Sequence, residues 1–259
     1  MKKYTLVLRG DEVSKQISQQ IKAGLKDYLI EDQDHPDLVI SIGGDGTILE
    51  SVHQYLNHDC CFVGVHTGTL GFFTDYQKDE VKDLIEDIKN NQYQYLPRHL
   101  LEVKVKGKEN HTFYALNEMR LDHGYRTQVI SVYINNHLLE VFRGNGLCVS
   151  TPSGSTGYNK SLGGSIIYPG HPLMQLSEVA GIHHNAYRSL GSSLILDDRQ
   201  VIKLIGEHFD DIYLGIDHLA YEVKDVDSIE IRISDKAVNF VEYKEMSFIT
   251  RVRRAFISE

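Results

Sequence analysis

The stretch Ser41–Glu50, which reads SIGGDGTILE, joins the end of one apolar segment to the start of another through a turn of glycines. Ile42 closes a run of apolar residues, and the isoleucine and leucine after Thr47 begin a helical repeat. Three glycines crowd the turn, yet an acid, Asp45, stands among them. A strand that passes through a glycine turn into a helix is typical of parallel α/β sheets, and small residues in such a turn let a ligand approach the backbone.

The segments on either side repeat this alternation of strand and helix. Apolar residues at helical spacing follow Asp11, which we expect to cap a helix, and they return after residue 80. The predicted strands are Lys3–Leu8, Asp37–Ile42 and Cys61–Val65, and the predicted helices carry Val13, Ile17, Ile21, Leu25 and Leu29, then Ile48, Leu49, Val52 and Leu56 within Thr47–Leu56, then Val81, Leu84, Ile85 and Ile88. This βαβαβα succession predicts a parallel sheet covered by helices.

After Pro97 the pattern changes to β-branched and aromatic segments separated by short polar turns, which predicts a mostly antiparallel β-domain. Strands are expected at Leu100–Val105, Phe113–Arg120, Gln128–Ile134, Leu138–Val149, Val201–Ile205, Ile212–Ile216, Ser228–Ile233 and Val238–Tyr243. The last stretch, FITRVRRAFI, predicts a short helix with Ile249, Val252 and Phe256 on one side. Its arginines suit the negative end of a helix dipole.

Composition and charge exclude several classes of protein. The 259 residues are 41% hydrophobic and 24% charged, and no apolar run is long enough to cross a bilayer or to serve as a secretory signal. The three cysteines predict no disulfide framework, and the histidines lack metal-ligand spacing, so no metal-binding cluster of side chains is expected. A net charge of −9 argues against nucleic acid as a partner. We expect a cytoplasmic protein that holds anionic ligands locally, through backbone N–H groups and helix N-termini.

The glycine turn has two interpretations, and it lacks both the GxxxxGK[ST] and the GxGxxG pattern. In the structural interpretation, Gly43, Gly44 and Gly46 supply unusual backbone angles and Asp45 caps the helix. In the functional one, the turn lies at the carboxyl end of a parallel strand, where open α/β sheets bind ligands, and its N–H groups hold phosphates. Asp45 then holds Mg²⁺ or accepts a proton from a hydroxyl that attacks a phosphoryl group.

A second polar segment, Val149–Gly164, reads VSTPSGSTGYNKSLGG and follows a predicted strand directly. Its six serine and threonine hydroxyls, with a single lysine, suit phosphate, ribose or base edges, although a plain polar loop has the same composition. Asn117 and Glu118, at the end of another strand, suit a base edge and a ribose diol. An exposed strand end explains them equally well.

Together these segments resemble the NAD kinase family, in particular its short bacterial members. The likeness covers essentially the whole chain and rests on GGDGT at 43–47, HTGTLGF at 66–72, Asn117-Glu118 and STPSGSTGYNKSLGG at 150–164, in this order. GGDGT alone also resembles phosphofructokinases and diacylglycerol-type lipid kinases, but the glycine segment expected of the lipid kinases is missing. The resemblance implies a kinase that transfers the γ-phosphoryl group of ATP to the 2′-hydroxyl of the adenosine ribose of NAD, giving NADP, with a divalent cation such as Mg²⁺.

The resemblance also implies a two-domain fold of the α/β plus β class. An N-terminal Rossmann-like parallel α/β domain, residues 1–96, carries GGDGT, and a mostly antiparallel β-domain, residues 97–245, binds the dinucleotide. The final segment, residues 246–259, packs back on the first domain. Such subunits assemble as homodimers or homotetramers with the site near the subunit boundary. They bind NAD and ATP rather than nucleic acid or membrane.

Matched residue by residue, the resemblance implies a set of site residues, and we assign none of them as a metal ligand. Asp45 matches the catalytic aspartate, which orients and deprotonates the 2′-hydroxyl. The binding residues implied are Gly44, Gly46 and Thr47 around the phosphates, Asn117 at adenine, Glu118 at the ribose hydroxyls, Ser153, Thr156 and Tyr158 along the nucleotide, Ser161 near the nicotinamide, and Asp217 and His218 close to the 2′-position.

Two positions depart from the family pattern. The short bacterial members have GDGL where this chain has GNGL, so Asn145 replaces an acid that contacts the nicotinamide carboxamide. Asn is isosteric with Asp but uncharged, and we expect altered selectivity at that end of the ligand. Gly157 stands where the family has Ala and adds backbone freedom to the binding loop. Two other functions stay open: a GGDGT kinase that acts on a lipid or sugar hydroxyl, and a non-catalytic dinucleotide sensor.

Overall fold

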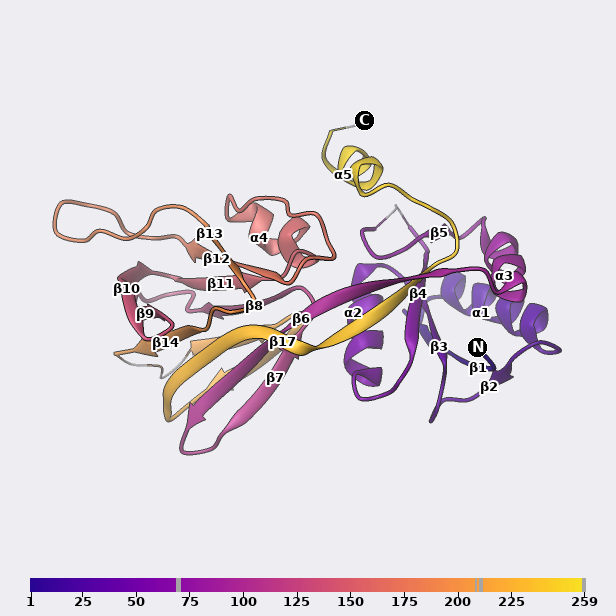
Figure 1. Cartoon of the computed structure of the whole chain (residues 1–259), viewed down its shortest axis with the longest axis horizontal. Coiled ribbons are helices and arrows are strands. Elements are labelled where there is room, and N and C mark those ends of the chain that lie inside the picture. The colour runs from indigo at the N-terminus through magenta and orange to yellow at the C-terminus, as the bar shows by residue number, and fades with distance from the viewer. Residues whose placement is uncertain (69–70, 208, 210–211, 258–259) are drawn as a thin grey trace. The chain divides into compact units, whose positions relative to one another are not determined.

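In the computed structural model the chain divides into two units, residues 1–98 with 238–259 and residues 99–237 (Figure 1). Two long strands, β6 (Gln94–Gly107) and β17 (Val226–Glu242), each continue from one unit into the other. The structure describes residues 1–68, 71–207, 209 and 212–257. Within these residues no helix has the length and apolar character needed to cross a bilayer.

The first unit is built on a parallel sheet. Its strands are β1 (Lys3–Leu8), β2 (Ile30–Glu31), β3 (Leu38–Gly43), β4 (Cys61–His66) and β5 (Tyr76–Gln77). They are ordered β2-β1-β3-β4, all parallel, and the other edge of β4 pairs with β5. Asn239 and Phe240 of β17 also pair with β4, in parallel. This pairing brings residues 238–245 into the first unit, whereas the sequence assigns them to the β-domain.

Three helices cover this sheet: α1 (Glu12–Leu25), α2 (Asp45–Tyr55) and α3 (Val81–Asn90). Asp11 caps α1 as predicted, because its carboxylate accepts the N–H of Ser14 at 2.7 Å. The helix ends before Leu29, which the apolar spacing assigned to it. Alternate residues of β3 share one hydrophobic cluster with α1 and α3, so the residues between them face the side on which α2 lies (Figure 1).

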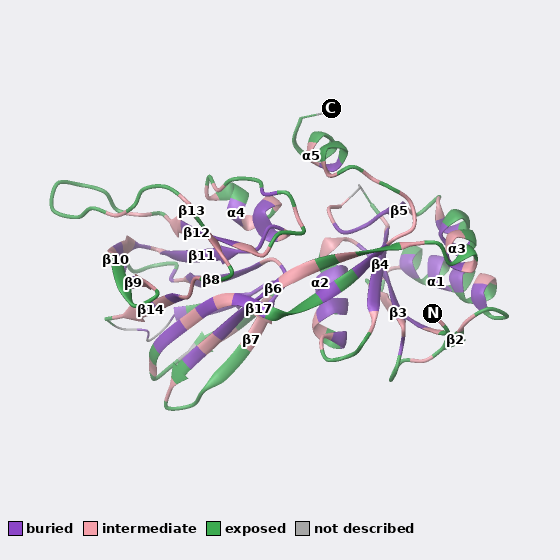
Figure 2. Ribbon diagram, in the orientation of Figure 1, coloured by how far each residue is buried: buried purple, intermediate pink, exposed green. Residues whose placement is uncertain are grey.

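The C-terminal helix α5 (Phe248–Phe256) contacts this unit through an arginine. Arg251 is the one buried residue of α5. Ile249 and Phe256, which the sequence places on one apolar side of the helix, are 67% and 39% exposed. Figure 2 shows that most of the helix is exposed. The Arg251 guanidinium forms an ion pair with Asp75, so for this residue the helix-dipole explanation drawn from the sequence is wrong.

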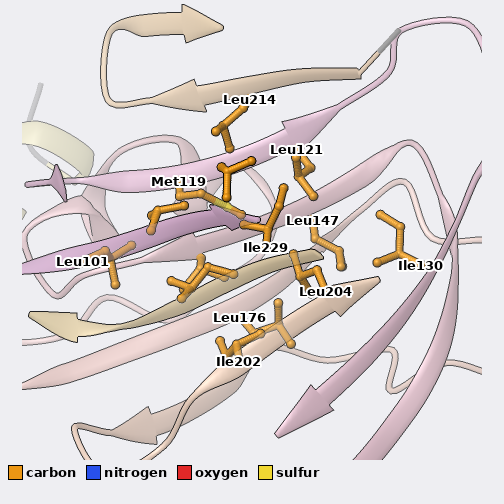
Figure 3. Packing of buried hydrophobic residues seen from close by; sticks show 14 of the residues in the cluster. Leu101, Met119, Leu121, Ile130, Leu147, Leu176, Ile202, Leu204, Leu214 and Ile229 are labelled. Carbon is orange, nitrogen blue, oxygen red and sulfur yellow. The ribbon is translucent and has the colours of Figure 1, made fainter. Parts of the chain in front are cut away.

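The second unit contains two antiparallel sheets that share a core. Its remaining strands are β7 (His111–Ala115), β8 (Glu118–Asp122), β9 (Gln128–Ile134), β10 (His137–Gly144), β11 (Gly146–Ser150), β12 (Leu173–Val179), β13 (Leu194–Asp197), β14 (Ile202–Gly206), β15 (Ile212–Ile216) and β16 (Leu219–Val223). One sheet runs β10-β9-β14-β17, with β6 beside β17 and β7 beside β6, and the other runs β13-β12-β11-β8-β15-β16. Figure 3 shows aliphatic side chains from both sheets in one buried cluster.

Four of the predicted strands are divided or joined in the structure. Phe113–Arg120 is two strands, β7 and β8, and Leu138–Val149 is likewise two strands, β10 and β11, separated at Asn145. Conversely, the two strands predicted at 228–233 and 238–243 are one continuous strand, β17. The first break has a distant cause, because the carboxylate of Asp217 takes the N–H groups of Leu116 and Asn117 at the point where a single strand would continue. Strands β12, β13 and β16 were not predicted from the sequence.

Candidate active site

The predicted site residues fall into two groups, one in each unit. In the first unit β3 passes into α2 through Gly44, whose backbone is extended at φ −116° and ψ −168°. Asp45 is the first helical residue, and its carboxylate accepts the N–H of Phe72 at 2.9 Å and that of Phe73 at 3.2 Å. The acid is therefore held in one orientation by the backbone of a second segment of the same unit.

These contacts contradict the structural interpretation of the glycine turn. Asp45 does not cap α2, and neither Gly43, Gly44 nor Gly46 has a positive φ. Gly43 is needed for packing, because a Cβ there would lie 2.1 Å from the hydroxyl of Thr47. A Cβ on Gly46, in contrast, would meet nothing within 4 Å. The absence of a side chain at Gly46 has no explanation in the packing of the described residues, and it leaves the backbone open to a ligand.

The start of α2 has the properties of an anion site. The first N–H groups of a helix lack the usual partner within the helix; in α2 the N–H of Thr47 donates to the carbonyl of Gly44, and no side chain caps the helix. Together with the helix dipole they favour a phosphate. The HTGTLGF segment begins beside this turn, where the N–H of Thr67 donates to the carbonyl of Gly43 at 3.0 Å. Thr69 and Leu70 of that segment lie outside the described residues, but a Cβ on Gly71 would be 2.2 Å from Asp45 Oδ1.

In the second unit, Asp217 brings together the predicted residues Asn117 and Glu118. Its carboxylate accepts the N–H groups of Leu116, Asn117 and Glu118 at 2.8, 2.7 and 3.2 Å. The residue lies in the turn after β15, with φ +52°, and its own N–H donates to the carbonyl of Glu118. These hydrogen bonds of Asp217 to backbone fix the segment that carries the two side chains. His218 follows it and is exposed.

The side chains of Asn117 and Glu118 each present a buried oxygen without a donor. Among the described residues, neither Asn117 Oδ1 nor Glu118 Oε2 has a hydrogen-bond partner. Burial, and after it the nearby carboxylate of Asp217, raise the pKa of Glu118 to about 7 against the opposing effect of Arg120. Buried acceptors are normally satisfied in folded proteins, so this pair indicates a site for a ligand that donates hydrogen bonds.

The hydroxyl-rich segment folds against these residues as a turn of 3₁₀ helix, η1 (Gly154–Thr156), followed by the short helix α4 (Tyr158–Ser161). The hydroxyl of Thr151 donates to the carbonyl of Leu116 at 2.6 Å and accepts the N–H of Gly154. A Cβ on Gly157 would be 3.8 Å from Glu118 Oε2. The structure therefore places Gly157 beside Glu118 and gives Thr151 a positioning role.

The other polar side chains of the segment divide into two groups. Ser150, Ser155 and Asn159 are buried; Ser155 donates to the carbonyl of Pro152 and the amide oxygen of Asn159 accepts from the hydroxyl of Ser177, whereas Ser150 Oγ and Asn159 Nδ2 have no partner among the described residues. The predicted ligand-binding side chains are more accessible: Ser153, Thr156 and Tyr158 are half-buried, and Ser161 is exposed. The accessible group is the one available to a nucleotide.

Asn145 is not brought close to the Asn117–Glu118 pair. Strands β8 and β11 are antiparallel, with Ser150 opposite Glu118 and Gly146 opposite Asp122. Asn145 therefore precedes the far end of β11, roughly 16 Å from Ser150 at about 3.3 Å per residue. Its backbone bonds to Val179 and His123.

Two features of the site were missed in the sequence. Arg120 lies over the ring of Tyr158 at 5.0 Å, and its positive charge lowers the pKa of Glu118. The alternation of a strand could have found it, because residues 118 and 120 share one face of β8. The N–H groups of Phe72 and Phe73 have no side-chain signal and could not have been found. Among the described residues there is no cluster of three or more His, Cys, Asp or Glu that could hold a metal ion.

Comparison with known proteins identifies the family. Residues 7–93 match the profile of the ATP-NAD kinase N-terminal domain, and residues 116–243 match that of the ATP-NAD kinase C-terminal domain. The chain belongs to the ATP-NAD kinase family. It is 39% identical to an NAD kinase of Staphylococcus saprophyticus and 40% identical to one of Staphylococcus aureus, in each case over 99% of this chain and 98% of the relative. The resemblance noted in the sequence is thereby confirmed.

Solved structures of this family confirm the fold. The yeast NADH kinase complexed with NADH superposes with a TM-score of 0.87 over 100% of this chain and 89% of that one, at 19% identity. An NAD kinase from Archaeoglobus fulgidus in complex with ATP gives 0.77 over 97% and 99%, also at 19% identity. An ATP-NAD kinase is an ATP-dependent phosphotransferase that phosphorylates NAD. The comparisons give no support to a lipid kinase, a sugar kinase or a sensor.

Proposed function

We propose that Asp45 is the catalytic base of this kinase. Its carboxylate orients the 2′-hydroxyl of the adenosine ribose of NAD and accepts its proton while the hydroxyl oxygen attacks the γ-phosphorus of ATP, giving NADP and ADP. The observation that carries this proposal is that Asp45 is fixed by the N–H groups of Phe72 and Phe73 at the uncapped start of α2. Positioning and charge stabilisation dominate phosphoryl transfer, and a fixed carboxylate among phosphate-binding N–H groups supplies both.

The phosphates are proposed to lie over Gly44, Gly46 and Thr47. Open space at Gly46 supports this arrangement, because phosphate oxygens can approach the N–H groups without meeting a side chain. Mg²⁺, the cation expected for this chemistry, neutralises phosphate charge when bound. The residues fit a cation held mainly by the nucleotide, since Mg²⁺ usually takes only one or two protein carboxylates together with phosphate oxygens, and Asp45 is the acid at this turn.

The adenosine of NAD is proposed to bind in the second unit. Asn117 meets the adenine edge and Glu118 accepts from the ribose hydroxyls, which would satisfy the two buried oxygens that lack donors. Ser153, Thr156, Gly157 and Tyr158 line the nucleotide, Ser161 lies toward the nicotinamide, and Asp217 and His218 adjoin the 2′-position. An extended dinucleotide also suits the placement of Asn145 at the opposite end of β11.

We also propose that the protein is a cytoplasmic homodimer or homotetramer with its site near the subunit boundary. Apolar side chains on the second unit support association: Leu138 is 55% exposed, Ile195 45% and Leu190 42%. Leu190 lies in the segment between β12 and β13, and its N–H donates to Glu140, which places this part of the segment beside β10. Sedimentation velocity tests the assembly, and a monomer at micromolar concentration would contradict it.

Asp45→Asn tests the catalytic role. Purified protein is incubated with ATP, Mg²⁺ and NAD, and NADP is detected with an NADP-specific dehydrogenase. We expect kcat to fall by roughly 10²–10⁴-fold with little change in KM for NAD, because the base is lost and the binding residues remain. Glu50→Gln, an exposed carboxylate on the same helix, is the matched control and should leave kcat unchanged. Full turnover by D45N would remove Asp45 from the reaction.

A further inference from the structure

The guanidinium of Arg251 in helix α5 is bonded to the segment Gly71–Asp75, which includes the last two residues of the HTGTLGF stretch. Its Nη1 donates to the carbonyl of Thr74 at 2.6 Å and to that of Gly71 at 3.3 Å, and its Nη2 bonds to the carboxylate of Asp75. Arg251 is 8% exposed and Asp75 also 8%. A planar guanidinium that serves three acceptors in a buried place fixes the positions of all three, which a flexible ammonium would not do.

The segment held by Arg251 is the segment that holds Asp45. Phe72 and Phe73, whose N–H groups bond to the Asp45 carboxylate, lie between the two carbonyls that accept from Arg251. The ring of Phe72 also stacks on that of Phe256 of α5 at 5.6 Å. Helix α5 thus contacts both the main chain of this segment and the side chain of Phe72, at the point where the segment bonds to the Asp45 carboxylate.

Displacement of this segment would reach Asp45 directly. Gly71 lies so close to the Asp45 carboxylate that a Cβ on Gly71 would be 2.2 Å from Asp45 Oδ1. A shift of the loop by a fraction of that distance would therefore break the two N–H contacts or push the carboxylate aside. Misplacement of a reacting group by about 1 Å can lower a rate on the order of 10²-fold.

We propose that Arg251 is a positioning residue for phosphoryl transfer: it fixes the segment Gly71–Asp75, whose N–H groups orient the carboxylate of Asp45. This inference rests on the proposed role of Asp45 as the base. It gives the C-terminal helix a function in catalysis although α5 contributes no group to the reaction. A purely structural role, in which Arg251 only anchors α5, predicts loss of stability without a specific effect on Asp45.

The test measures kcat, KM for NAD, KM for ATP and the melting temperature of Arg251→Ala and Arg251→Lys, each in the wild-type and D45N backgrounds. Arg253→Ala, which removes an exposed arginine of the same helix, is the matched control. In the wild-type background we expect R251A to lower kcat at least about tenfold with both KM values within about twofold, and R251K to lie between R251A and wild type. R253A should match the wild type.

The D45N background separates the two roles. If Arg251 acts through Asp45, R251A lowers the residual kcat of D45N by less than about twofold, because coupled residues are not additive. An equal loss in both backgrounds, or a loss of kcat that only follows the fraction of folded protein, would overturn the inference. Should R251A fail to fold, R251K alone decides by the same comparison. If D45N retains full kcat, the proposed base fails; if D45N is impaired and R251A is not, only the role of Arg251 fails.

Discussion

Glu118→Gln removes the carboxylate of the proposed nucleotide site whose pKa the folded structure raises most clearly. Glu118 is 8% exposed, its Oε2 has no donor among the described residues, and Asp217 lies nearby. These surroundings raise the pKa of Glu118 from 4.5 to about 7. The folded protein therefore holds a proton on Glu118 at pH values where the unfolded chain has released it.

The size of the effect follows from this difference. Because each pKa unit corresponds to about 1.4 kcal/mol, a rise from 4.5 to about 7 destabilises the folded protein by roughly 3 kcal/mol above pH 7. Below pH 4.5 both states are protonated and the cost vanishes; linkage gives roughly 1 kcal/mol at pH 5. The neutral amide of E118Q has no such dependence. The variant should therefore gain roughly 2–3 kcal/mol relative to wild type between pH 5 and pH 8.

Urea unfolding followed by far-UV circular dichroism measures this difference, since the chain has no tryptophan to report by fluorescence. The comparison at pH 5 serves as the internal control, because there the difference in the free energy of unfolding comes mostly from effects of the substitution that do not depend on pH. A stability difference between E118Q and wild type that is the same at both pH values would refute the reasoning. In the wild type, KM for NAD should fall as pH rises through 7, because the ionised carboxylate is the better acceptor for ribose hydroxyls.

Four other substitutions test the remaining parts of the site. Gly46→Ala should leave the free energy of unfolding within about 1 kcal/mol of wild type and yet lower kcat/KM for ATP about tenfold or more. Gly43→Ala should lower the free energy of unfolding by roughly 1–3 kcal/mol, because its Cβ would meet Thr47. Thermal melts and ATP kinetics distinguish the two variants. Asp217→Asn weakens three hydrogen bonds to a charged acceptor and should cost roughly 2–4 kcal/mol in urea unfolding while raising KM for NAD; an unchanged KM would show that the Asn117–Glu118 segment does not need this anchor. Asn145→Asp should change the ratio of kcat/KM values among nicotinamide-ring analogues and leave KM for ATP unaltered, and equal effects on both would contradict its placement.

The sequence predicted those parts of the fold that depend on local pattern. Lys3–Leu8, Gln128–Ile134 and Ile212–Ile216 are strands with the bounds expected, because a short segment rich in β-branched, aliphatic and aromatic residues is visible in the sequence itself. The predicted strand Phe113–Arg120 is broken by a carboxylate 100 residues away from Asn117, and no local pattern contains that contact. The family resemblance supplied the residue types of the candidate site. It did not supply the backbone N–H groups that hold Asp45, since a backbone donor has no letter in the sequence.

The hydrogen bonds from backbone N–H groups to Asp45 explain how an acid can lie in a turn that is proposed to bind phosphate. A free carboxylate at the start of α2 would repel the phosphates that the helix N-terminus attracts, in a protein whose net charge is already −9. In the structure, one N–H group bonds to each oxygen of Asp45, which offsets part of its charge, and a carboxylate has about four acceptor sites, so others remain for a substrate hydroxyl. Asp217 is held in the same way by three N–H groups in the other unit. In the proposed site, backbone donors would therefore let acidic side chains serve two polyanionic substrates without a compensating field of lysine and arginine.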